Sequence, residues 1–261
     1  MVDTKIEWAD STWNPVTGCW HTCEYCYARA IANRFKGCDA APDGKSDQKI
    51  ITLTERLQVT RKSGLKLNAA YPYGFTPTLH EYRLGDPLKK GFGKNIFVCS
   101  TADLFGEWVP DEWIEKVFAA CKAATGHRYL FLTKNPDRYF RLTKAGKLPE
   151  DDNFWYGTTT AHPEAPLFFS DRHHTFVSVE PILEPFVEES GSSCAVMATE
   201  WAIFGAETGN RKNKVVPERS WIEDYVRLMQ EHGRPVFMKN SMVPIWGDDI
   251  ITQFPWEAEE K

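Results

Sequence analysis

Short apolar runs recur through most of this chain, and segments with a helical period separate several of them. The runs are rich in β-branched and aromatic residues, and they are 95–99, 129–132, 154–157, 175–179, 201–205 and 235–238. A strand leading into Cys19 would bring their number to about seven. Strands that alternate with helices pair in parallel, because each crossover returns the chain to the same end of the sheet. The pattern therefore predicts an α/β fold built on parallel strands.

Two connecting segments, 111–125 and 218–232, repeat apolar residues at helical spacing and are followed by a glycine. We expect both to be helices with one buried face. In the first segment, Asp111 is the predicted N-cap. Cys121 falls on its apolar face, so we expect this cysteine to be a core residue.

The length of 261 residues suits one α/β barrel domain, and we expect a single domain over 1–261. Two stretches depart from the regular alternation. Residues 37–94 are rich in Gly, Pro and Lys, and 181–200 combine acidic residues with Gly-Ser-Ser. Long loops are usually functional, so 37–94 is interpreted as an insertion or lid. The acidic end, 256–261, is expected to be a mobile tail.

The net charge of −5 argues against a general basic coat for binding phosphate backbones. One local basic segment, 127–147, carries Lys and Arg against the single acid Asp137. It is a candidate for nucleic-acid contact, and the alternative is an ordinary solvated helix face. No apolar run approaches the ~20 residues that span a bilayer, and the first residues lack the features of a signal peptide. We therefore expect a cytoplasmic protein with no membrane contact.

Three of the seven cysteines, Cys19, Cys23 and Cys26, form a Cys-x3-Cys-x2-Cys loop that runs into an expected helix at 27–35. The odd total and this grouping favour a metal or redox site in a reducing compartment over a disulfide framework. Thiolates are soft ligands that suit iron–sulfur clusters or zinc, and a helix N-terminus favours the negative charge of such a site. Three ligands would hold a [4Fe–4S] cluster and leave one iron open to chelate S-adenosylmethionine.

Two other interpretations of the cysteines stay open. A zinc site would recruit Cys38 or His21 as its fourth ligand, although structural zinc usually uses two pairs of Cys or His ligands. Alternatively, the three cysteines are unrelated core residues, which the polarity of the loop argues against.

The cysteine spacing, with the aromatic Tyr25 just before the third cysteine, resembles the signature of the radical S-adenosylmethionine superfamily. Further segments resemble one branch of it, a phage- and prophage-associated family of three-cysteine-motif proteins of unknown function. These segments are 13–19, 97–105, 131–138, 177–181 and 203–209. The resemblance covers most of the chain and implies a partial (β/α)6-type, TIM-like barrel of parallel strands with long loop insertions. It also implies a [4Fe–4S] cluster that cleaves S-adenosylmethionine to a 5′-deoxyadenosyl radical.

Polar residues follow the apolar runs, where active sites gather in parallel barrels. The candidates for cofactor binding are Tyr25, Ser100, Asp103, Thr133, Lys134, Thr158, Glu180 and Glu207. The candidates for catalysis are Glu180, Glu207 and Lys239.

The resemblance suggests roles for some of these candidates. Tyr25 would lie near the adenine, Asp103 would accept hydrogen bonds from the amino group of methionine, and Lys134 would pair with its carboxylate. Glu207 would bind ribose hydroxyls or the substrate. Each role has a simpler alternative, in which Asp103 caps a helix, Lys134 is solvated and Glu180 closes a turn.

The leading hypothesis is a radical S-adenosylmethionine enzyme whose substrate is a nucleoside, nucleotide or nucleic-acid base. The basic segment 127–147, ten tryptophans with potential stacking faces and the phage association implied by the resemblance motivate this substrate class. A flavodoxin- or ferredoxin-like protein is the expected electron donor. The alternative is an iron–sulfur- or zinc-stabilised nucleic-acid-binding module without catalysis. A third hypothesis is a radical enzyme that acts on a peptide or small metabolite.

Overall fold

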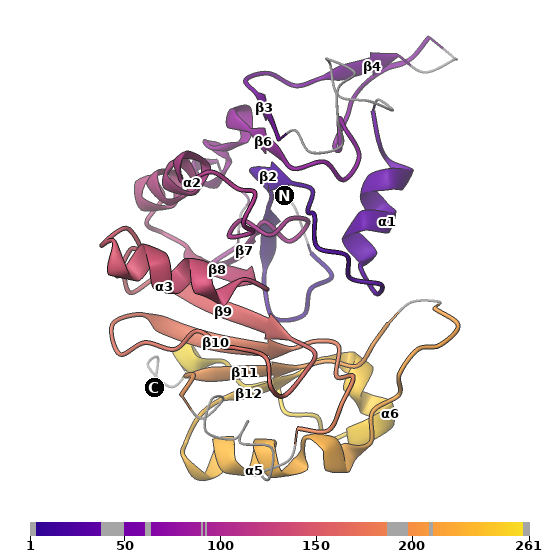
Figure 1. Cartoon of the computed structure of the whole chain (residues 1–261), viewed down its shortest axis with the longest axis vertical. Helices are drawn as coiled ribbons and strands as arrows, with labels where there is room; N and C mark the ends of the chain where they lie inside the picture. Colours follow the sequence, from indigo (N-terminus) through magenta and orange to yellow (C-terminus); the bar gives the residue numbers. More distant parts are fainter. Residues whose placement is uncertain are drawn as a thin grey trace. The chain divides into compact units, whose positions relative to one another are not determined.

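Seven strands make up the main sheet of the fold, in a computed structural model that describes residues 4–37, 50–60, 64–89, 91, 93–186, 198–208 and 211–257 (Figure 1). They are β1 (Ser11–Trp13), β7 (Asn95–Val98), β8 (Arg128–Thr133), β9 (Phe154–Thr160), β10 (His174–Val179), β11 (Trp201–Phe204) and β12 (Val236–Met238), in this order. β1, β7 and β8 pair in parallel, and so do β9 to β12. The predicted α/β fold with parallel strands of the partial-barrel type is confirmed.

Two compact units divide the chain. The first consists of Met1–Thr4 and Ala9–Leu132, and the second of Lys5–Trp8 and Thr133–Lys261. The single domain expected over 1–261 stays a prediction.

In the first unit, α2 (Asp111–Ala123) has one buried face. Phe118 of this helix packs edge to face on Phe131 of β8, with ring centroids 5.5 Å apart. Cys121 is fully buried, which confirms it as a core residue. The predicted N-cap was wrong: Pro110 holds that position without a side-chain cap, and Asp111 is the first helical residue. Its carboxylate still lies in the first turn, where the helix dipole favours negative charge.

The predicted insertion at 37–94 has secondary structure of its own. It contains β3 (Ile51–Leu53), β4 (Gln58–Thr60), β5 (Lys66–Asn68), β6 (Thr78–His80), η1 (Glu81–Arg83) and η2 (Asp86–Leu88). β2 (Val16–Thr17), β6 and β3 form a three-stranded sheet, and β4 pairs with β5 in a separate hairpin. Residues 38–49, 61–63, 90 and 92 of this stretch lie outside the described residues.

In the second unit, α5 (Glu223–Glu231) covers one face of β10 to β12 (Figure 1). The other helical elements are α3 (Pro136–Lys144), η4 (Arg219–Trp221), η5 (Asn240–Met242), α6 (Val243–Trp246) and η6 (Pro255–Glu257). The helix predicted over 218–232 is divided, because η4 precedes the α-helix and the two do not merge. Of the irregular stretch 181–200, residues 187–197 lie outside the described residues.

The prediction of a mobile tail over 256–261 was wrong for its first residue, Trp256. Trp256 is 6% exposed and packs edge to face on Trp201 at 5.4 Å and on Trp155 at 5.7 Å. Its burial stabilises the end of the chain, since a large aromatic ring removes much apolar surface from water. Residues 258–261 lie outside the described residues.

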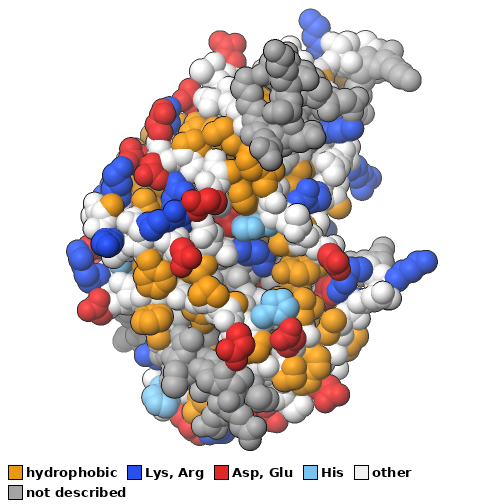
Figure 2. All heavy atoms as spheres, in the orientation of Figure 1, with side chains coloured by type: hydrophobic (Ala, Val, Ile, Leu, Met, Phe, Trp, Pro, Cys, Tyr) orange, Lys and Arg blue, Asp and Glu red, His pale blue; other side chains and the backbone are white. Residues whose placement is uncertain are grey.

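Acidic and basic side chains are interspersed on the face that Figure 2 displays. Within the described ranges, no helix combines the length and apolar character needed to cross a bilayer. Six of the ten tryptophans are buried core residues, namely Trp8, Trp13, Trp113, Trp155, Trp201 and Trp256. Those six rings are therefore occupied by packing, which weakens the case for tryptophan stacking on a substrate.

His80 at the end of β6 is a fully buried, neutral imidazole. Its Nε2 lies 2.8 Å from Thr17 Oγ1, and its Nδ1 lies 3.0 Å from the Tyr82 hydroxyl. Burial, assisted by the nearby positive charge of Arg83, lowers the pKa of His80 from 6.5 to about 3. The protonated form is disfavoured because burial removes its hydration.

We predict that the free energy of unfolding falls when the pH is lowered. The unfolded chain binds a proton at His80 below pH 6.5, whereas the folded chain does so only near pH 3. The stabilisation is therefore fully present above the unfolded pKa and is lost as the pH falls towards the folded pKa. Going from pH 7 to pH 5 should cost about 2 kcal/mol, measured by urea denaturation. The His80→Gln variant cannot titrate, and an equally steep pH dependence in this variant would contradict the assignment.

Candidate functional site

The cysteine loop of the first unit begins at a backbone position that only glycine fits. Gly18 has φ of +86°, and a Cβ there would lie 2.3 Å from the carbonyl oxygen of Thr76. The Gly18 N–H donates to the carbonyl of Thr101 at 3.0 Å, and the Cys19 N–H donates to that of Phe75 at 3.1 Å. The loop is thus fixed on two sides before its first thiol.

The three thiols lie around the start of α1 (Tyr27–Arg34). Cys26 is the N-cap of this helix, and its Sγ accepts a hydrogen bond from the Arg29 N–H at 3.4 Å. Cys19 Sγ accepts one from the His21 N–H, also at 3.4 Å. All three cysteines are partly exposed free thiols, and Tyr25 between them is partly exposed as well. The His21 N–H directed at the sulfur of Cys19 favours the thiolate form that metal binding requires.

Burial and nearby negative charge oppose that thiolate form at Cys19. Burial, followed by the charge of Asp103, raises the pKa of Cys19 to about 12, and Cys23 and Cys26 add smaller contributions in the same direction. A bound metal cation would offset both effects, since metal binding and thiol deprotonation are coupled.

The residue types are those that an iron–sulfur cluster uses, namely soft sulfur donors next to a helix N-terminus. Among the described residues, no group of three or more His, Cys, Asp or Glu side chains could hold a single metal ion. Of the two fourth ligands considered for zinc, Cys38 lies outside the described residues. The Nε2 of His21 lies 2.9 Å from Asp103 Oδ2.

Asp103 is 5% exposed, and both of its carboxylate oxygens have partners within the first unit. Oδ2 contacts His21, and Oδ1 accepts from the Phe105 N–H at 3.0 Å. The ring of His21 meets the Trp108 ring edge to face at 4.9 Å. Asp103 therefore orients His21 beside the cysteine loop and also closes a local turn through the Phe105 N–H. The simpler alternative, in which Asp103 caps a helix, was wrong, because no helix begins in the fully described stretch between β7 and α2.

Asn14, just after β1, accepts hydrogen bonds from the residues that follow β7. Its Oδ1 accepts from the Thr101 N–H at 3.1 Å and from the Ser100 hydroxyl at 3.2 Å. The Ser100 carbonyl accepts from the hydroxyl of Tyr27 at 3.0 Å. The sequence suggests a positioning role for Asn14 at the entry to the cysteine loop, but it offers His21 only as a fourth zinc ligand. Their only sequence signal is their position within or just before the cysteine motif.

In the second unit, Glu180, Gly205 and Lys239 form a row at the carboxyl ends of β10, β11 and β12. The Gly205 N–H donates to the Val179 carbonyl at 3.1 Å, and the Lys239 N–H donates to that of Phe204 at 2.9 Å. The strand ladder therefore continues one residue beyond each strand. The Lys239 ammonium donates to Oε1 of Glu180 across the glycine, with the two side chains 18% and 25% exposed.

Gly205 leaves room for this ion pair. A Cβ at this position would lie 3.1 Å from both the Cγ of Glu180 and the Cδ of Lys239. A side chain at this central position would therefore press on both partners of the ion pair, which would have to shift to make room. The arrangement places one proton donor and one proton acceptor at the strand ends, where parallel barrels carry their chemistry.

Glu207, also in the second unit, pairs with an arginine four residues later. Arg211 donates through Nε and Nη2 to the two carboxylate oxygens, each at 2.7 Å, and the Val215 N–H adds a third contact at 3.3 Å. The bond from Arg211 is the main cause that lowers the pKa of Glu207. This carboxylate is 2% exposed, so it holds the loop after β11 together.

The remaining candidates of the second unit bond to nearby backbone. Thr133 accepts from the Asn135 N–H at 2.9 Å, and Thr158 accepts from the Phe168 N–H at 3.0 Å. Both threonines are buried, whereas Lys134 is partly exposed. The structure thus brings Glu180 and Lys239 together, while Thr133, Thr158 and Glu207 serve their own loops.

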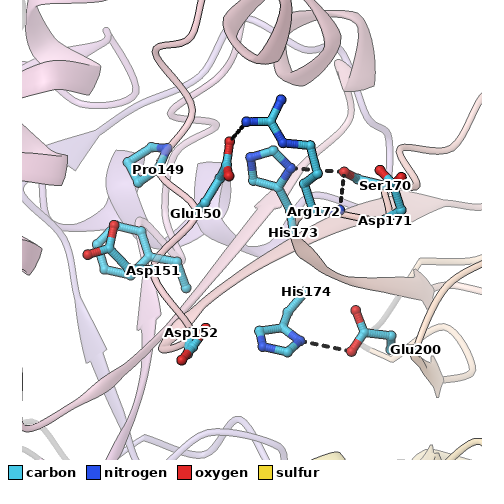
Figure 3. A pocket seen from close by; sticks show the side chains of 11 residues that line it. Pro149, Glu150, Asp151, Asp152, Ser170, Asp171, Arg172, His173, His174 and Glu200 are labelled. Atoms are coloured by element: carbon cyan, nitrogen blue, oxygen red, sulfur yellow. Dashed lines mark hydrogen bonds and ion pairs between the residues drawn. The ribbon is translucent and has the colours of Figure 1, made fainter.

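A pocket of ≈ 400 Å³ lies at the amino ends of β9 and β10 (Figure 3). Figure 3 shows Arg172 turned towards Glu150 and His174 turned towards Glu200. The His174 ring stacks on Trp155 at 4.6 Å, and its Nδ1 lies 2.8 Å from Glu200 Oε2. No sequence motif marks this pocket. Because it lies at the strand ends opposite Glu180 and Lys239, we assign it to strand packing rather than to chemistry.

Fold and site together define a class, an α/β protein of parallel strands that carries a three-cysteine loop at a helix N-terminus. The chain belongs to the family described as "Protein of unknown function (DUF5131)", whose family model matches residues 3–250. No curated protein and no solved structure matches the chain.

We predict that side chains at position 205 destabilise the protein in order of size. Gly205→Ala should cost about 1 kcal/mol and Gly205→Val about 2–3 kcal/mol, because the added atoms separate Glu180 from Lys239. Thermal unfolding measures the difference. Gly126→Ala is the matched control, because a Cβ there meets nothing within 4 Å. Equal effects at the two glycines would contradict the role assigned to Gly205.

Proposed function

We propose that this chain is a cytoplasmic radical S-adenosylmethionine enzyme that acts on a nucleoside, nucleotide or nucleic-acid base. The observation that carries the proposal is the cysteine loop. Three partly exposed thiols follow a position that only glycine fits, and the last thiol caps α1. A loop with three free thiols is also typical of proteins in a reducing compartment.

Cys19, Cys23 and Cys26 would hold a [4Fe–4S] cluster, which when bound supplies the one-electron chemistry that divides S-adenosylmethionine into methionine and a 5′-deoxyadenosyl radical. The rest of the first unit positions these ligands. Gly18 anchors the loop to the backbone, and Asp103 orients His21 next to it. Such support is what keeps metal ligands in a productive geometry.

The residues at the strand ends of the second unit would handle the substrate. Lys239 Nζ carries a proton that it shares with Oε1 of Glu180. An anionic substrate group, such as a phosphate, would compete with this carboxylate for the ammonium. In this proposal Glu207 is a positioning residue, since Arg211 and Val215 satisfy its carboxylate.

An exposed aromatic pair on the second unit supports a nucleic-acid substrate. Phe140 of α3 is 41% exposed and Phe169 is 51% exposed, and their rings meet edge to face at 6.4 Å. Arg141 and Lys144 of the same helix are exposed beside them. Exposed aromatic rings flanked by cations are a typical platform for stacked bases and backbone phosphates.

We predict that anaerobic reconstitution with iron and sulfide gives a brown protein with about four irons per chain. With S-adenosylmethionine and a chemical reductant it should release 5′-deoxyadenosine, measured by chromatography. Replacing any one of Cys19, Cys23 and Cys26 by Ala should abolish product and lower the iron content. Cys121→Ala is the control, because that thiol is a core residue of α2 and should leave both readouts intact.

Two results would count against the enzyme. A colourless protein with one tightly held zinc would favour the metal-stabilised binding module. A brown protein that releases no 5′-deoxyadenosine would leave a cluster without the proposed chemistry.

We further predict that the double variant Phe140→Ala, Phe169→Ala binds a single-stranded oligonucleotide at least about tenfold more weakly, because each stacked base contributes ~1–3 kcal/mol. Fluorescence anisotropy measures the affinity. Val216→Ala, at a side chain that is 69% exposed, is the control. If the unaltered protein binds no oligonucleotide, or if the double variant binds equally well, the aromatic platform is refuted.

A further inference from the structure

Helix α1 leaves a row of large apolar side chains exposed. Tyr27 is 55% exposed, Ile31 38% and Phe35, the C-cap, 51%, whereas the buried residues of the helix are Ala28 and Ala32. Residues four apart lie on one face of a helix, so the three side chains form a stripe about 12 Å long. We call these three residues the α1 stripe. Such a grouping marks a contact surface more often than a single exposed side chain does.

The charged residues of the α1 segment itself have one sign. Residues 27–36 include Arg29, Arg34 and Lys36 and no acidic residue, although the whole chain carries a net charge of −5. The guanidinium of Arg29 donates to the carbonyl of His21 in the cysteine loop. That of Arg34 lies 5.4 Å from the centre of the Phe35 ring. An apolar stripe with cations beside it is complementary to a partner with an acidic rim around an apolar centre.

The position of the stripe links it to the proposed cluster. Cys26 caps α1, so the stripe begins at the residue that follows the third thiol. Electron-transfer complexes are transient and use small interfaces, often below ~1,200 Å² in total. One face of a short helix is of that scale, whereas a permanent interface usually needs more apolar area.

We infer that the α1 stripe is the docking surface for the electron donor, a small acidic one-electron carrier protein. The inference rests on the proposed function and names the donor's place on the first unit. One electron leaves the reduced donor, which is oxidised by one electron, and it reduces the oxidised cluster by one. No proton or group is transferred in this step, and no bond forms or breaks in the chain.

The test begins with binding. The affinity of a flavodoxin for the reconstituted protein is measured by calorimetry at low ionic strength, without turnover. Ile31→Glu and Phe35→Glu should each raise the Kd about tenfold or more, because each removes an apolar contact and adds a charge that repels an acidic partner. Arg34→Glu should weaken binding and reduce its salt dependence.

Matched controls lie elsewhere on the first unit. Leu88→Glu changes an apolar side chain that is 65% exposed on η2, and Lys122→Glu reverses an exposed charge in the last turn of α2. Neither control should alter the Kd. Circular dichroism checks that every variant is folded.

A second measurement separates this inference from the proposed function. With dithionite as the electron source, Ile31→Glu should form 5′-deoxyadenosine within about twofold of the unaltered protein, whereas flavodoxin-driven formation should fall with the binding affinity. If dithionite yields no product in the unaltered protein, the proposed function fails. If dithionite yields product but Ile31→Glu and Phe35→Glu bind flavodoxin normally, the docking surface alone is refuted. A stripe that instead holds two copies of the chain together, seen as a dimer lost in these variants, also refutes it.

Discussion

The burial of parallel strands on both faces is the constraint on which the rest of this structure depends. Parallel pairing requires crossovers, and the crossovers cover the sheet with apolar contacts. Every residue of β11 and all but the first of β10 are buried. Polar chemistry can then appear only where the strands end. Glu180 follows the last residue of β10, and Lys239 follows the last residue of β12. These two candidate substrate-binding residues therefore lie where the apolar core ends.

Two glycines determine how the candidate site residues are placed. Gly18 lets the cysteine loop approach the backbone at Thr76 more closely than any side chain would allow. Gly205 leaves open the space in which Glu180 and Lys239 meet. In both places the functional groups lie on neighbouring residues, and glycine contributes by having no Cβ. A search for chemically reactive residue types alone would overlook both positions.

The strands were the most predictable part of the fold, because alternation and β-branched composition are local signals. All six apolar runs coincide with strands β7 to β12 to within a few residues. Two predictions of the fold were wrong, one at a helix end and one at the end of the chain. Asp111 is one residue inside its helix, because Pro110 holds the cap. Trp256 belongs to the core, because rings from distant strands surround it.

The same difference between local signals and long-range contacts applies to the candidate site. The order of residues was sufficient to predict the α/β class and the parallel strands, because periodicity is a property of short segments. It also marked the three cysteines of one short loop as candidate ligands. The partners of the site residues depended on folding. Asp103 meets His21 across 82 positions of the chain, and Lys239 meets Glu180 across 59. Pairing between strands that are distant in sequence brings such groups together. The residues next to each group in the sequence give no local signal of that contact.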